Sequence, residues 1–279
     1  MLRRAVTGAF LAAGLIALLW VQGWLLRIAL VAMMVISFWE MYDAFEKRGA
    51  RPVRWVGIIY ALLSLPLYLL RGSAALGPLM TVACMLGLAM IILRGKVDFP
   101  SAVATLFPML YPGMMVTLMF PMQDISSKTL ASMALTLTFA VAFLTDVLAY
   151  IVGSRWGRHK LSPELSPHKS VEGAVAGLAA GVLSAILVPL IAGWITTYVP
   201  MAVPYAVDLP PLWQFALLGL IGSAASQIGD LTASMVKRYC GIKDFGNMFP
   251  GHGGMMDRMD GVLFTGVVVY VYFFMVIKL

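Results

Sequence analysis

Nine apolar segments, joined by short polar connections, limit what this chain of 279 residues can fold into. They cover residues 5–20, 24–39, 55–70, 75–93, 101–120, 129–152, 173–199, 212–227 and 261–277. A helix that crosses a bilayer needs about 20 apolar residues, and in lipid every backbone N–H and C=O must find its partner within the protein. Only 12% of the residues are charged, which is about half the share of a soluble domain. We therefore predict an all-α integral membrane protein with about nine transmembrane helices.

The predicted helices divide into two regions. Residues 1–128 hold five spans and form an N-terminal transmembrane region. Residues 129–279 hold four spans and two polar loops, 153–172 and 229–260. Because both loops carry most of the charged residues of this half, we expect it to be the catalytic or binding region.

The basic residues are spread unevenly over the predicted connections. With nine spans and a cytoplasmic N-terminus, all but four of the 20 Lys and Arg residues fall on the cytoplasmic side; the four are Arg27, Arg71, Lys128 and Lys278. Basic residues concentrate in cytoplasmic loops of membrane proteins, so the asymmetry favours this topology. A basic face at a membrane attracts anionic lipid headgroups and phosphates, and nucleic acid is not expected as a partner. The absence of sorting motifs favours a multi-pass protein of a bacterial plasma (inner) membrane, with its polar site facing the cytoplasm.

The stretch 229–261 carries an unusual mixture of charges between two apolar segments. It holds four aspartates, four Lys or Arg residues and a glycine-rich loop. Carboxylates bind hard divalent cations, whereas lysine, arginine and free backbone N–H groups bind phosphate. Such a combination suits a magnesium–nucleotide complex handled at a membrane surface.

Three aspartates of this stretch are candidates for metal binding. If the eighth helix continues to Arg238, then Ser226, Asp230, Ser234 and Lys237 share one face of it. A helix end that extends its charges into water would explain the basic residues but not the short carboxylate of Asp230. Asp257 and Asp260 precede the ninth span, where helix capping is the alternative to metal binding. Carboxylates from two helices could then share one Mg²⁺.

The loop 243–254 is the predicted phosphate-binding segment. Gly246, Gly251, Gly253 and Gly254 allow unusual backbone angles and close approach of main-chain N–H groups to a ligand. The loop is not a Walker motif, and a simple turn is the alternative. For His252 no second histidine or cysteine stands at zinc-ligand spacing, so we expect it to bind phosphate, order the loop or act in catalysis rather than hold zinc.

A second polar cluster lies between the sixth and seventh spans. Asp146 sits within an apolar run and is expected to be buried, with Tyr150 on the same helix face. The following loop is basic and contains two prolines, and Ser170 is positioned to cap the seventh helix. A solvated cytoplasmic loop explains the basic residues but not Asp146.

These two clusters carry a resemblance to a known family. The stretch 229–261 closely resembles the C-terminal signature of phosphatidate cytidylyltransferases, also called CDP-diacylglycerol synthases. The matching residues are Ser234, Lys237, Arg238, Lys243, Asp244, Pro250, Gly251, His252, Gly253, Gly254, Asp257, Arg258 and Asp260. The upstream cluster also matches, at Asp146, Tyr150, Gly153, Gly157, Ser166, Pro167, Lys169, Glu172 and Gly173. His168 and Ser170 depart mildly from the family pattern, and the resemblance covers about the last half of the chain.

The resemblance implies an activity and a set of roles. The reaction is CTP + phosphatidate → CDP-diacylglycerol + pyrophosphate, with Mg²⁺ required, Asp230 and Asp257 as metal ligands and room for a second cation. We expect Lys237, Arg238, Lys243 and Arg258 to bind phosphate, Asp244 and Asp260 to hold a second cation or orient the lysines, and His252 to complete the catalytic group. The expected substrate-binding residues are Asp146, Tyr150, Ser166, Pro167, Lys169, Ser234, Gly251, Gly253 and Gly254.

Two other functions are compatible with the same residues. A membrane lipid kinase that uses CTP would need a similar site, and an ion-coupled transporter would use intramembrane acids such as Asp146 and Asp230. No inverted repeat is visible, which argues against the transporter. Gly173, Gly177 and Gly181 recur at every fourth residue, a spacing that lets helices pack closely and leaves a homodimer open.

Overall fold

The computed structural model describes residues 8, 13–19, 21–198, 209–249, 251 and 253–275. Within these residues eight helical segments are long and apolar enough to cross a membrane, and the chain is a multi-pass, all-α membrane protein apart from one short hairpin. Half of the predicted first span, 5–20, lies outside the described residues, and its described residues 8 and 13–19 are helical. The helical segments are α2 (Gly23–Lys47), α3 (Arg54–Arg71), η1 (Ser73–Ala75) with α4 (Leu76–Ile92), the broken helix α5–η2–α6–α7 (Phe99–Met122), α8 (Lys128–Trp156), α9 (Val171–Tyr198), α10 (Leu212–Cys240) and α11 (Met256–Met275).

Several helices extend beyond the apolar segments that predicted them. The segment 24–39 becomes α2, which ends at Lys47, and the segment 212–227 becomes α10, which ends at Cys240. Both ends are closed by a glycine with positive φ, Gly49 and Gly241, whose flanking amides bond back to the last turn of the helix. This glycine-terminated ending satisfies the last carbonyls and stops each helix. The predicted loop 229–260 is therefore shorter than expected, because residues 229–240 are helical and α11 begins at Met256.

The described chain forms two compact units. The first comprises Met1–Pro121 and Met235–Met259, and the second comprises Met122–Ser234 and Asp260–Leu279. This division differs from the predicted boundary at residue 128, because the segment 235–259 belongs with the N-terminal helices. Contacts between Glu40 of α2 and the start of α11 explain the difference and are described below.

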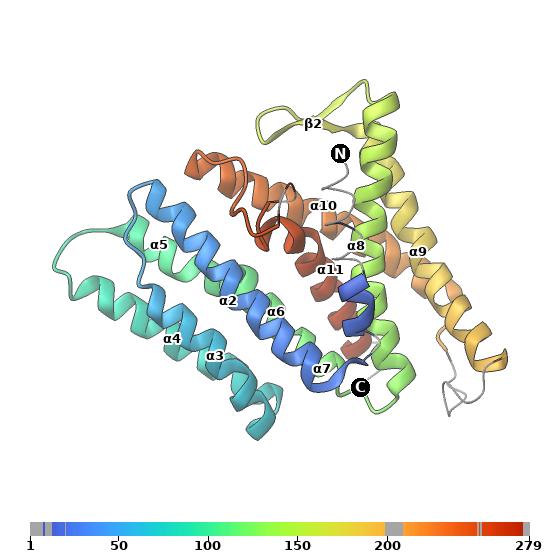
Figure 1. Cartoon of the computed structure of the whole chain (residues 1–279), viewed down its shortest axis with the longest axis horizontal. Coiled ribbons are helices and arrows are strands. Elements are labelled where there is room, and N and C mark those ends of the chain that lie inside the picture. The colour runs from blue at the N-terminus through green and yellow to red at the C-terminus, as the bar shows by residue number, and fades with distance from the viewer. Residues whose placement is uncertain are drawn as a thin grey trace. The chain divides into compact units, whose positions relative to one another are not determined.

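In the first unit α2, α3, α4 and α5 lie side by side (Figure 1). The broken helix α5–η2–α6–α7 is interrupted at Tyr111, whose backbone is not helical and which precedes a cis Pro112. The connections after α2 and after α4 lie at the same end of the unit, since Arg94 donates to the carbonyl oxygen of Arg51. The end of α10 is also there, with Arg48 over the Tyr239 ring at 5.5 Å. Three basic connections that were predicted to share one face of the membrane thus share one end of this unit.

In the second unit α8 and α9 run antiparallel along each other and are joined by the hairpin of β1 (Lys160–Ser162) and β2 (Ser166–Ser170) (Figure 1). The predicted small-residue packing is confirmed. A side chain at Gly173 would meet the carbonyl oxygen of Ala149 at 2.6 Å, and one at Gly177 would meet that of Thr145 at 3.1 Å. Gly181 faces Gly219 of α10 in the same way. These glycines let the helix backbones approach, which is how membrane helices gain contact without a hydrophobic driving force.

Replacing Gly177 by Leu should therefore destabilise the second unit. A leucine there has no room beside Thr145 and Ala149, and overpacking of this kind costs about 1–3 kcal/mol. Thermal unfolding in detergent, followed by circular dichroism, measures the effect. Ala179→Leu is the control, because Ala179 is exposed on the same helix. Equal unfolding temperatures for the two variants would contradict the packing role of Gly177.

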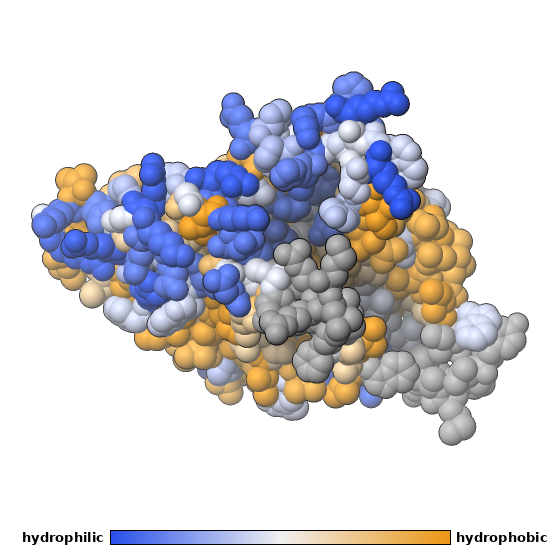
Figure 2. Space-filling view, turned by 45° about the horizontal axis from the view of Figure 1, so that its top comes forward, coloured by the Kyte–Doolittle hydropathy of each residue, from blue (hydrophilic) through white to orange (hydrophobic). Residues whose placement is uncertain are grey.

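Figure 2 shows how polar and apolar residues are distributed on the visible surface. On the face shown, hydrophilic residues gather toward the top of the view and apolar residues cover much of the surface below them. Exposed apolar side chains of the described residues include Leu70, Ile92 and Trp194. Exposed apolar surface of this extent is expected where lipid rather than water is the solvent.

Candidate active site

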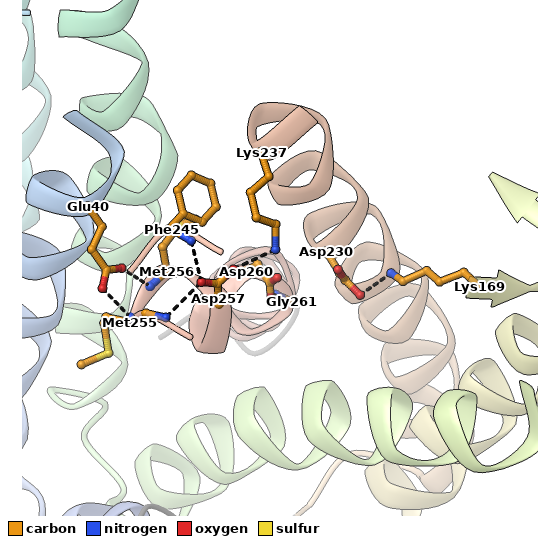
Figure 3. A network of polar contacts seen from close by, with 11 residues as sticks. Glu40, Lys169, Asp230, Lys237, Phe245, Met255, Met256, Asp257, Asp260 and Gly261 are labelled. Atoms are coloured by element: carbon orange, nitrogen blue, oxygen red, sulfur yellow. Dashed lines mark hydrogen bonds and ion pairs between the residues drawn. The ribbon is translucent and has the colours of Figure 1, made fainter. Parts of the chain in front are cut away.

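The buried carboxylate of Asp257 organises the polar loop of the first unit. Its Oδ2 accepts hydrogen bonds from the backbone N–H of Phe245 at 2.8 Å and of Gly254 at 3.0 Å, and its Oδ1 pairs with Lys237 Nζ at 2.7 Å (Figure 3). The Asp257 side chain is 3% exposed. Asp257 lies one residue inside α11 rather than at its cap, and a carboxylate in the first turn is favoured by the helix dipole. We call Lys237, Phe245, Gly254 and Asp257 the Asp257 cluster.

Lys237 comes to this cluster from the last turn of α10. Its ammonium group lies 5.6 Å from the centre of the Phe245 ring as well as beside Asp257, and its side chain is 15% exposed. Breaking a largely buried ion pair with good geometry is costly, because the remaining charge is then left without a partner where water solvates it poorly. An ammonium group has three N–H donors, so Lys237 can hold Asp257 and still donate to a second anion.

The glycines of the loop are required by its conformation. Gly251 and Gly253 have φ of 78° and 80°, in the region that side chains disfavour. Phe249 N–H donates to the Gly253 carbonyl oxygen at 3.0 Å and closes the turn between them. A side chain at Gly253 would also meet the Asp257 carboxylate at 2.8 Å. The sequence predicted close approach of main-chain N–H groups of this loop to a ligand, and that prediction stays open. In the structure the Gly254 N–H donates to the Asp257 carboxylate of the protein itself.

The other predicted residues of the first unit are exposed. Four charged residues that are close in sequence to the Asp257 cluster have exposed side chains: Arg238, Lys243, Asp244 and Arg258. Exposed basic side chains are accessible to a phosphate group, so their exposure suits the role predicted for Arg238, Lys243 and Arg258. His252 and its neighbour Pro250 lie outside the described residues.

Sequence reasoning missed one acid of this unit. Glu40, on α2, accepts hydrogen bonds from the N–H groups of Met255 and Met256, both at 2.9 Å. Its residue is 8% exposed. The predicted apolar segment ended at Trp39, one residue earlier, so Glu40 fell outside it and was not singled out. An acid seven residues before the true helix end is the same signal that singled out Asp146, and a correct boundary would have found it.

In the second unit Asp230 is paired with Lys169. Asp230 lies on α10 and Lys169 on β2, and the Lys169 ammonium contacts Asp230 Oδ2 (Figure 3). Both side chains are about a quarter exposed, at 27% and 25%. The hairpin that carries Lys169 is fastened at its base by Glu172, whose carboxylate accepts from Arg158 N–H at 3.0 Å and contacts His159 Nδ1 at 2.7 Å. Ser170 Oγ accepts from Gly173 N–H at 3.2 Å, which confirms the predicted cap.

The remaining predicted residues of this unit differ in exposure. Asp260 is buried, and its Oδ1 accepts from Gly261 N–H at 2.8 Å. Asp146 was expected to be buried but is exposed, as is Tyr150. The neighbouring Thr145 is fully buried, and one step along a helix turns the side chain by about 100°, which takes Asp146 off the packed face. Ser234 is buried, Ser166 is half-buried and Pro167 is exposed.

The two carboxylates predicted as metal ligands suit a hard cation by their chemistry. Asp257 Oδ1 and Asp230 Oδ2 each already hold a positively charged lysine nitrogen. Carboxylate oxygens are the ligands that Mg²⁺ prefers, so both side chains have the donor chemistry for this metal ion. Among the described residues no group of three or more His, Cys, Asp or Glu side chains gathers as a complete metal centre.

Residues 2–276 match the sequence profile of the cytidylyltransferase family, and the chain belongs to this family. It is also similar to bacterial proteins named phosphatidate cytidylyltransferase. The protein of Synechocystis sp. is 50% identical over 64 residues, which are 22% of each chain. That of Brucella abortus is 31% identical over 134 residues, 48% of this chain and 44% of the relative. That of Mycobacterium tuberculosis is 49% identical over 59 residues, 21% of this chain and 18% of the relative. Each match thus spans less than half of the relative's length.

Proposed function

We propose that this protein transfers CMP from CTP to phosphatidate, giving CDP-diacylglycerol and pyrophosphate. The observation that carries the proposal is the family match over residues 2–276, to which the relatives named phosphatidate cytidylyltransferase add a substrate. The charged residues of both units suit this chemistry, since they pair carboxylates with lysines beside exposed basic side chains.

The proposed reaction is a direct transfer between the two substrates and needs no covalent intermediate with the protein. An oxygen of the lipid phosphate attacks the α-phosphorus of CTP, a new P–O bond forms, and the bond to the β-phosphate breaks to release pyrophosphate. A phosphate monoester has its second pKa near 6, so the attacking group is mostly dianionic at neutral pH and needs no general base. The difficulty is to bring two polyanions together in line, which is a task of positioning and charge neutralisation.

We propose that basic residues of the first unit perform this task. In the proposal Lys237, Arg238, Lys243 and Arg258 bind phosphate oxygens, with Arg258 and Arg238 able to form two parallel hydrogen bonds each. Lys237 begins in contact with Asp257 and needs only to add or exchange one partner. In the first unit Gly251, Gly253 and Gly254 of the loop are proposed to bind substrate through their backbone N–H groups. In the second unit the residues proposed to bind substrate are Asp146, Tyr150, Ser166, Pro167, Lys169 and Ser234.

Asp257 and Asp230 are each proposed as a ligand of Mg²⁺. When bound, the metal ion supplies charge neutralisation at the α-phosphate and at the departing pyrophosphate. The lysines beside the two aspartates keep these carboxylates oriented in its absence. Asp244 and Asp260 are proposed to hold a second cation or to orient the lysines.

The proposed setting is the cytoplasmic face of a bacterial plasma membrane. The diacyl tails of phosphatidate remain in lipid, and only its headgroup reaches the polar residues. The basic connections that share one end of the first unit would attract both anionic substrates. The close-packed glycine helices are compatible with a homodimer.

Purified protein in detergent, supplied with Mg²⁺, phosphatidate and CTP labelled separately in its α- and γ-phosphates, tests the activity. The proposal predicts α-label in lipid and γ-label in pyrophosphate. Transfer of the γ-label to lipid would instead identify a lipid kinase. If folded protein transferred neither label to lipid, both enzymatic functions would be contradicted. The ion-coupled transporter would then be the favoured function.

A further inference from the structure

Glu40 connects the N-terminal helices to the polar loop, 215 and 216 residues further along the chain. Its two carboxylate oxygens each accept one backbone N–H, Oε1 from Met255 and Oε2 from Met256. These are the residues at which α11 begins, where N–H groups have no partner inside the helix. A side chain from another helix therefore caps α11.

The loop is shaped to fit this carboxylate. A side chain at Gly254 or Gly246 would collide with the Glu40 carboxylate, so both positions must be glycine for Glu40 to reach the backbone. Tyr239, near the end of α10, contacts Phe45 of α2, whereas Met256 contacts Glu40. Glu40 and Phe45 are five residues apart on α2, which corresponds to about 7.5 Å along a helix. The end of α10 and the start of α11 therefore contact α2 at points about one and a half turns apart.

The residues held by Glu40 are the ones that hold Asp257. Gly254, whose N–H donates to Asp257 Oδ2, immediately precedes Met255, and Asp257 immediately follows Met256 (Figure 3). Moving Met255 and Met256 must therefore move Asp257 and one of its donors together. Among the described residues the contacts of Glu40 are with backbone N–H groups, so its carboxylate is used for holding the loop and not for an ion pair.

We propose that Glu40 is a positioning residue that fixes the direction of the Asp257 carboxylate through the backbone of Met255 and Met256. The proposal rests on the proposed function, in which Asp257 binds Mg²⁺. Glu40 itself touches neither substrate nor metal. In the structure each of the two N–H groups has its own carboxylate oxygen. Glutamine keeps one of these oxygens and would put an NH₂ donor against the other N–H.

The test compares Glu40→Ala and Glu40→Gln with Glu46→Gln. Glu46 is a matched control on the same helix, where it binds the side chain of Arg54 and not the loop. Hydrogen–deuterium exchange of the segment 241–258 reports on the loop without requiring turnover. We expect faster exchange there in Glu40→Ala, with the rest of α2, α3 and α4 unchanged, a smaller effect in Glu40→Gln and none in Glu46→Gln.

Kinetics supply the second readout. Loss of an outer residue that orients a metal ligand typically costs about 10–100-fold in metal affinity or activity. We expect Glu40→Ala to raise the Mg²⁺ concentration for half-maximal turnover and to lower kcat within that range, with the KM for phosphatidate unchanged. Glu40→Gln should recover part of the loss because it keeps one acceptor.

Two results would overturn the positioning role. One is wild-type exchange in 241–258 together with a wild-type Mg²⁺ dependence in Glu40→Ala. The other is loosening of all helices of the first unit in Glu40→Gln, which would make Glu40 a general stabilising residue. Absence of CTP turnover in the wild-type protein would refute the proposed function alone, since the exchange measurement still decides whether Glu40 holds the loop.

Discussion

Asp257→Asn is expected to lower turnover by more than about 100-fold at saturating Mg²⁺, because even outer-sphere losses at metal sites reach that size. The asparagine oxygen can still accept from the N–H groups of Phe245 and Gly254. Its NH₂ group, however, would face the Lys237 ammonium, so two donors replace an ion pair. With the Asp257 side chain only 3% exposed, we also expect a loss of stability of roughly 3 kcal/mol.

The measurement must separate these two effects. Turnover of labelled CTP is compared at a temperature well below the unfolding midpoint of the variant, which circular dichroism determines. Asp43→Asn is the matched control, because Asp43 also belongs to the first unit and also pairs with a basic residue, Arg54, at 2.6 Å. Near-wild-type turnover in folded Asp257→Asn would exclude Asp257 as a metal ligand.

The helices were largely predictable from the sequence, whereas their ends were not. The length of the apolar segments alone located the eight spans that the structure describes. In lipid the backbone N–H and C=O groups of such a segment find hydrogen-bond partners within it only when the segment is helical. The ends of α2 and α10 depend on glycine caps and on partners for polar residues in the last turns. The helix α2 extends past its apolar segment through Glu40, whose carboxylate accepts hydrogen bonds from the backbone N–H groups of the distant Met255 and Met256. A pattern of hydropathy contains no information about such a partner.

The site was predictable as a set of residues but not as a set of contacts. Asp230, Lys237 and Asp257 stood out because charge beside a bilayer is expensive unless it has a function. Their pairing could not be deduced, since Lys169 and Asp230 are 61 positions apart and nothing local relates them. The prediction for Asp146 was wrong about burial, because an apolar run does not say which side of a helix is packed.

At Asp230 function and stability separate more clearly than at Asp257. The adjacent Gly229 packs against the backbone of Asp260 on α11, where a side chain would collide with the carbonyl oxygen. Helix packing therefore fixes this part of α10 without help from the Asp230 carboxylate. Its ion pair with Lys169 is partly exposed, and exposed pairs contribute about 0–1 kcal/mol. Asp230→Asn should unfold at nearly the wild-type temperature.

Turnover, in contrast, should fall by more than about 100-fold in Asp230→Asn, as for loss of any inner metal ligand. Glu164→Gln is the control of equal charge, in the exposed turn between β1 and β2. Lys169→Met removes the partner and leaves the carboxylate, so it should retain more activity than Asp230→Asn if the carboxylate acts on a metal. If Lys169→Met instead loses as much as Asp230→Asn, Lys169 is itself required, through its proposed contact with substrate or through its ion pair with Asp230, and the metal-ligand role of Asp230 loses this support. Because neither substitution is expected to disturb the packing at Gly229, a difference between them reports on charge and not on folding.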